Sequence, residues 1–110
     1  MGADSFVVYY GIRLIVQNEA ETSALERRTD PRQRAARDAG LKSYFGRLTD
    51  GEPHHLLIGT EIGVFGIENQ TCIEMPMDRL LQAVEVTDRK LKEAGFLQKP
   101  ALVFQLEAQY

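Results

Sequence analysis

The residues of this chain that could carry chemistry are a histidine pair, a single cysteine and a group of arginines. His54 and His55 follow a predicted turn, and a neutral imidazole is the usual proton acceptor near pH 7. Adjacent residues on a strand point to opposite faces, so the two rings cannot easily share a metal ion. No HxH or HExxH motif is present either. We therefore expect no metal, and we take His55 as the candidate catalytic residue.

Other catalytic signatures are weak. Cys72 would be a reactive nucleophile only beside a cation, and the nearest charged residue is Glu74. Gly59, Gly63 and Gly66 are spaced four and three apart, unlike a GxGxxG phosphate loop, and they indicate bulges in a strand. The sequence therefore predicts no cofactor and favours a binding or regulatory module over an enzyme.

The arginines are concentrated in one segment. Residues 26–42 hold six basic and three acidic residues, a local charge of +3 in a chain of net charge −3. Arg27, Arg28 and Arg32 lie near the predicted helix start at Asp30-Pro31 and lack acidic partners one helical turn away. We take these three arginines as a candidate site for an anionic small molecule or an acidic protein partner. The acidic remainder of the chain argues against nucleic acid as the partner.

These side chains are positioned by alternating apolar segments in the order strand, helix, strand, strand, helix, strand. The first helix is expected in two pieces, with N-caps at Ser23 and Asp30. The expected elements are a strand over 5–16, a helical region over 18–39, a strand over 42–48, an Asp50-Gly51 turn, a strand from His54, a helix over 76–94 and a strand over 101–110.

This element order predicts an α+β, ferredoxin-like βαββαβ sandwich, in which an antiparallel sheet carries both helices on one face. The length of 110 residues predicts one domain, residues 1–110. The segment Ile62 to Ile67 is either the same strand after a bulge or a fifth strand.

Composition predicts a cytoplasmic location. No apolar run approaches the roughly 20 residues that a membrane span needs, so we expect no membrane association. The start lacks the basic and apolar regions of a signal peptide, and one cysteine forbids an internal disulfide.

In this architecture the sheet face opposite the helices is open unless a partner covers it. The usual strand order places the first and third strands in the middle. The expected open face then carries mixed apolar and polar side chains from all four strands: Val7, Tyr9, Arg13, Ile15, Phe45, Arg47, His55, Leu57, Val103, Gln105 and Glu107.

Three uses of this face compete. A homodimer interface accounts directly for its apolar residues. A small-molecule pocket would use Arg13 or Arg47 to hold an anion and Tyr9 to stack, and His55 would be the general base if the protein were an enzyme. Single-stranded RNA would stack on aromatic residues of the central strands, but residues 62–66 offer one phenylalanine and no lysine or arginine. We therefore predict a cytosolic binding module that acts as a homodimer.

Overall fold

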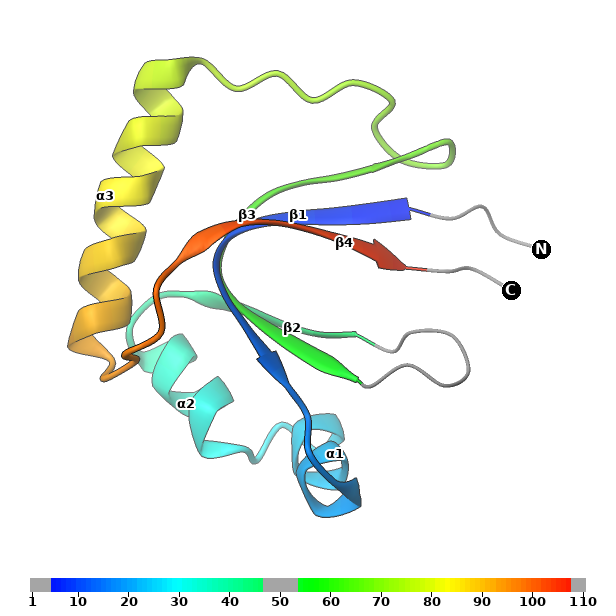
Figure 1. The fold of residues 1–110 in the computed structure, drawn as a ribbon, viewed down its shortest axis with the longest axis vertical. Helices are drawn as coiled ribbons and strands as arrows, with labels where there is room; N and C mark the ends of the chain where they lie inside the picture. Colours follow the sequence, from blue (N-terminus) through cyan, green and yellow to red (C-terminus); the bar gives the residue numbers. More distant parts are fainter. Residues whose placement is uncertain (1–4, 47–53, 108–110) are drawn as a thin grey trace.

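The computed structural model describes residues 5–46 and 54–107, which form four strands and three helices (Figure 1). In chain order they are β1 (Ser5–Ile15), α1 (Glu19–Glu26), α2 (Pro31–Asp38), β2 (Lys42–Gly46), β3 (His55–Gly66), α3 (Met77–Glu93) and β4 (Ala101–Glu107). The α+β class is confirmed, and α1 with α2 takes the place of the first predicted helix.

The four strands form one antiparallel sheet in the order β2-β3-β1-β4. The first and third strands therefore lie in the middle, as expected. A fifth strand at Ile62 is wrong, because β3 continues through this region to Gly66. The β1–β3 register pairs Val8 with Gly63 but Tyr9 with Glu61, so Ile62 is an extra residue in a bulge.

The sheet curls strongly about Gly11 and Gly59, which lie opposite each other on β1 and β3 (Figure 1). A Cβ on Gly11 would overlap the carbonyl oxygen of Ile58, and a Cβ on Gly59 would overlap that of Tyr10. Only glycine permits so close an approach of two backbones. The curl gives the sheet a convex face, which carries α2 and α3, and a concave face.

A hydrogen bond across the concave face confirms the curl. Gln105 lies in register with Val7, six residues along β1 from Arg13. An extended strand covers about 20 Å over that separation. The Arg13 Nε nevertheless donates to the Gln105 Oε1 at 2.7 Å, so the two ends of β1 bend toward each other.

The two short helices begin at side-chain caps. Asn18 caps α1 by accepting a hydrogen bond from the Glu21 amide, so the expected start at Ser23 is wrong; the earlier cap extends the helix by a turn. Asp30 caps α2 and Pro31 occupies its first turn, as predicted. Gly40 follows α2 with a φ of +79°, in the left-handed region that favours glycine.

The longer helix, α3, is fixed to the convex face mainly by its C-terminal half. The Tyr10 hydroxyl donates to Asp88 Oδ1 at 2.7 Å, and the hydroxyls of Thr60 and Thr87 lie 2.5 Å apart. Leu91 is buried in the core, whereas Met77 and Leu81 near the start of α3 are exposed. The N-terminal half of α3 therefore covers little of the sheet.

The core divides into two clusters, one on each face of the sheet. The convex cluster contains buried residues of the sheet, the helices and their connections: Ile12, Val16, Leu25, Ala36, Leu41, Leu56, Ile58 and Leu91. The concave cluster contains Val7, Tyr9 and Leu57, with Tyr44 and Val103 packed against them.

The expectation of an open face at Tyr9, His55 and Leu57 is therefore wrong. Tyr9 is only 3% exposed and His55 is 0% exposed, because the curl folds this face onto itself. Phe45 was also expected on that face, but it packs against the convex cluster instead. The surface that is open lies on the other side of the sheet.

Candidate functional site

Three of the predicted site residues, Tyr9, Arg13 and His55, lie on the concave face, where Tyr9 and His55 are buried. The ring centroids of Tyr9 and Tyr44 are 6.5 Å apart, and those of Tyr44 and His55 are 6.4 Å apart. Arg13 is exposed but its guanidinium is bonded to Gln105. Arg47, the other predicted anion ligand, lies outside the described residues.

Burial disfavours the charged forms of His55 and Tyr9. Desolvation, together with smaller electrostatic interactions with Arg13 and His54, lowers the pKa of His55 to about 4. Desolvation likewise raises the pKa of Tyr9 to about 12, with Glu61 and Tyr44 adding to the shift. His55 is therefore a neutral imidazole at pH 7, but its ring has no exposed surface at which to meet a substrate.

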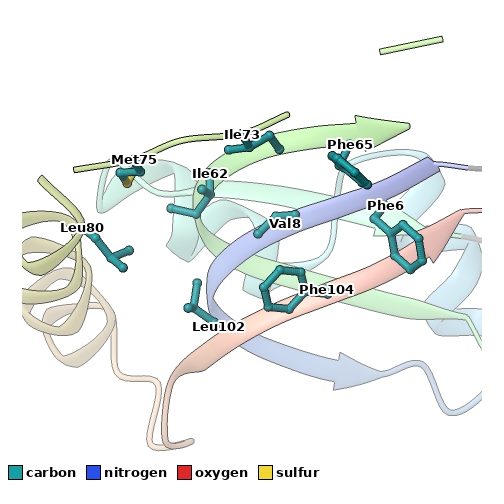
Figure 2. A pocket seen from close by; sticks show the side chains of 9 residues that line it. All are labelled: Phe6, Val8, Ile62, Phe65, Ile73, Met75, Leu80, Leu102 and Phe104. Atoms are coloured by element: carbon teal, nitrogen blue, oxygen red, sulfur yellow. The ribbon is translucent and has the colours of Figure 1, made fainter. Parts of the chain in front are cut away.

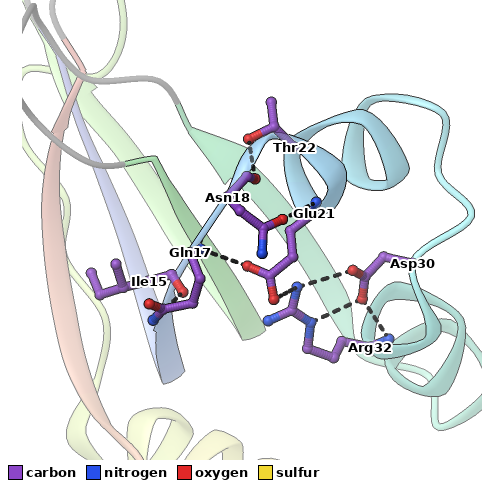
Figure 3. A network of polar contacts seen from close by, with 7 residues as sticks. All are labelled: Ile15, Gln17, Asn18, Glu21, Thr22, Asp30 and Arg32. Atoms are coloured by element: carbon purple, nitrogen blue, oxygen red, sulfur yellow. Dashed lines mark hydrogen bonds and ion pairs between the residues drawn. The ribbon is translucent and has the colours of Figure 1, made fainter.

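Arg32, predicted to lack a local partner, is held in an ion-pair network between α1 and α2 (Figure 3). Its Nε lies 2.9 Å from Asp30 Oδ1 and its terminal nitrogen 3.7 Å from Glu21 Oε1. The hydrogen bonds from Arg32 hold the pKa of the Asp30 carboxyl below its usual value. The acidic partners of Arg32 thus lie two residues away and on the neighbouring helix, and its guanidinium is already engaged within the chain.

The other two predicted arginines, Arg27 and Arg28, follow the end of α1 and have different surroundings. Arg27 is the C-cap residue of α1, whereas Arg28 has a φ of +60° and lines a cavity of about 500 Å³. We call this cavity the basic groove; it lies between the helices and β2, and its lining residues are Leu25, Glu26, Arg28, Gln33, Arg37 and residues 41–45. Of the three arginines, only Arg28 therefore lines the basic groove.

The sequence did not predict a second cavity, which is apolar and has a volume of about 480 Å³. It lies on the convex face, beyond the part that the helices cover (Figure 2). We call it the apolar groove. Its lining comes from β1, β3, β4, the 67–76 connection and the start of α3: Phe6, Val8, Ile62, Phe65, Ile73, Met75, Leu80, Leu102 and Phe104. Figure 2 shows Leu80 of α3 facing the sheet residues across this space.

The apolar groove has the chemistry of a binding surface. All nine lining residues are apolar, so none of their side chains is a general acid, a general base or a nucleophile. Phe104 is 66% exposed, and Phe6, Phe65, Leu102 and Leu106 are exposed around it. Monomeric proteins rarely leave so large a contiguous apolar patch in water.

The sequence held a partial signal for this groove. The alternation of Leu102, Phe104 and Leu106 correctly placed them on the helix-bearing face. Residues on that face are buried only where a helix covers them, and these three are exposed. The shortness of α2, eight residues against eleven in β1, is the sequence feature that indicates incomplete cover.

Metal-ligating side chains, the cysteine and membrane-spanning helices are the remaining features to compare within the described residues. Residues 5–46 and 54–107 contain no group of three histidine, cysteine, aspartate or glutamate side chains placed to hold a metal ion. Cys72 is an exposed free thiol. No helix in the same part of the chain combines the length and apolar character that a membrane crossing requires.

The apolar groove is thus the strongest candidate functional site, and its assignment depends on geometry alone. Comparisons of the chain with family models, curated proteins and solved structures found no match.

Proposed function

We propose that this chain is a ferredoxin-like interaction module that forms a homodimer through its apolar groove. The observation that carries the proposal is the lining of this groove, which consists of nine apolar residues. Burying such a surface stabilises association by about 25 cal/mol for each Å² of apolar area removed from water. An apolar partner is therefore favoured over a charged one.

A second copy is the partner that the strand arrangement favours. β4 is an edge strand, and its exposed residues Leu102, Phe104 and Leu106 follow one another along one face. A two-fold axis beside β4 would bring the same residues of both copies together, as an isologous interface requires. It would also pair the outer edge of β4, which has no strand partner among residues 5–46 and 54–107 and would otherwise invite uncontrolled association.

The other functions considered receive less support. An acid–base enzyme with His55 as base needs substrate at a side chain that is fully buried. RNA stacking needs exposed rings on the central strands, whereas Tyr9 lies inside the concave cluster. The exposed thiol of Cys72 suits a reducing compartment, so the proposal places the module in the cytosol.

Sedimentation equilibrium tests the proposal. We expect the wild-type chain, of 12.4 kDa, to sediment at twice that mass. Phe104→Glu places a charge in the groove at an exposed position, so it should give a monomer with an unchanged circular dichroism spectrum. Leu97→Glu is the matched control, because Leu97 is 96% exposed and lies outside the groove.

Two results would overturn the homodimer. One is a wild-type monomer at high concentration, which would leave the groove to an apolar small molecule. The other is equal loss of the dimer in Phe104→Glu and Leu97→Glu, which would place the interface elsewhere.

A further inference from the structure

The basic groove lies at the opposite edge of the sheet from the apolar groove. β2 is the other edge strand, with β3 as its only strand partner in the part of the chain that the structure describes. The lining of the groove includes four of the five residues of β2, Lys42 to Phe45, and the adjoining Leu41. Such a run along one strand means that the groove follows the unpaired edge of β2, with α1 and α2 as its far wall.

The charge of this groove is mainly positive. Arg28 at the end of α1, Arg37 in the last turn of α2 and Lys42 at the start of β2 all line it. Glu26 is the single acidic residue among the lining side chains. Lys42 also lies 3.6 Å from Glu61 but its side chain is 69% exposed, so the surrounding solvent weakens that pair.

The floor of the groove is apolar. Leu25 and Leu41 are buried members of the convex cluster, and Phe45 packs against that cluster. An edge strand, a basic rim and an apolar floor together match the way in which proteins add an extended peptide to a sheet. Main-chain hydrogen bonds then supply affinity, while alternate side chains of the peptide meet different surroundings.

We propose that the basic groove binds an extended acidic peptide segment of a partner protein, which pairs with the free edge of β2. Carboxylates of the peptide meet Arg28, Arg37 and Lys42, and its apolar side chains face the floor. The positive charge of the rim selects an acidic segment over a basic one. This site is separate from the apolar groove and does not depend on dimer formation.

Fluorescence anisotropy with a labelled synthetic peptide tests this site. The probe is a short peptide of alternating glutamate and valine, compared with one of alternating lysine and valine. We expect binding of the acidic peptide only, weakening as salt is raised because exposed charges are screened. The double variant Arg28→Glu with Arg37→Glu should lose at least about tenfold in affinity.

Two matched controls separate strand addition from general charge attraction. Arg34→Glu reverses an exposed charge on α2 that does not line the groove, and it should bind as the wild type does. A peptide of the same sequence with N-methylated amides cannot donate main-chain hydrogen bonds, so its affinity should fall sharply.

The proposal is overturned if the acidic peptide does not bind, or if Arg34→Glu weakens it as much as the double variant does. The proposal would also be overturned if the N-methylated peptide bound as tightly as the unmodified acidic peptide, or if inorganic phosphate alone displaced the acidic peptide. That pattern would identify a simple anion site.

Discussion

The convex face of the sheet has two halves that differ only in what covers them. Around Leu56 and Ile58 the strands pack beneath α2 and α3, and their apolar side chains are buried. Around Phe6 and Phe104 the same face is exposed. An eight-residue helix such as α2 is about 12 Å long, whereas the eleven residues of β1 measure about 36 Å along the curved strand. Alternation therefore selects a face, but helix length decides how much of that face becomes core.

The boundary between the two halves gives the largest predicted effect. Gly11→Val should prevent folding, because the added side chain overlaps the backbone of β3 at Ile58. Gly95→Ala is the control: its Cβ would meet nothing within 4 Å, although Gly95 has a φ of +89°. We expect a loss of only about 1 kcal/mol there. Urea unfolding measures both, and a well-folded Gly11→Val variant would show that the close approach does not produce the curl.

Truncating an apolar side chain should cost much more stability in the covered half of the convex face than in the exposed half. Leu56→Ala removes a fully buried side chain and should lower the free energy of unfolding by about 3 kcal/mol. Phe104→Ala, at an exposed position, should lower it by less than about 1 kcal/mol under conditions where the chain is monomeric. Equal losses in urea unfolding would mean that the exposed half is packed as tightly as the covered half.

The buried His55 on the concave face should make the stability of the fold depend on pH. His55 has a pKa of about 4 when folded and 6.5 as its ordinary value, so the unfolded chain binds more protons between these values. The free energy of unfolding is therefore not reduced by His55 above pH 6.5. It falls as the pH is lowered from 6.5 toward 4, by about 3 kcal/mol in all. His55→Leu should flatten that part of the pH profile of unfolding. His54→Leu, one residue away on the other face, should keep it.

The smallest losses of stability are expected when the N-cap residues of α1 and α2 are replaced. Asp30→Ala removes the cap of α2 and the ion pair with Arg32, so it should lower stability by about 2 kcal/mol. Asn18→Ala removes only the cap of α1 and should lower it by about 1 kcal/mol. Thermal unfolding ranks the two, and the reverse order would mean that α2 contributes less than α1 to covering the core.

The strand and helix order followed from local patterns, because alternation, the Asp30-Pro31 start and the glycine stops all act within a few residues. The curl depends on contacts between distant residues, Gly11 with Gly59 and Arg13 with Gln105, which no local pattern reveals. A period of two separates the faces of a strand without indicating which face becomes concave. For this reason the sequence places Tyr9 and His55 on an open face, although both are buried in the structure.

The most direct test of the homodimer is an isotope-filtered NOE experiment on an equimolar mixture of ¹³C-labelled and unlabelled chains. We predict contacts between copies that involve Phe6, Leu102, Phe104 and Leu106, and none that involve residues of β2. The absence of contacts between copies, or contacts confined to the β2 edge, would contradict the assignment of the apolar groove as the dimer interface.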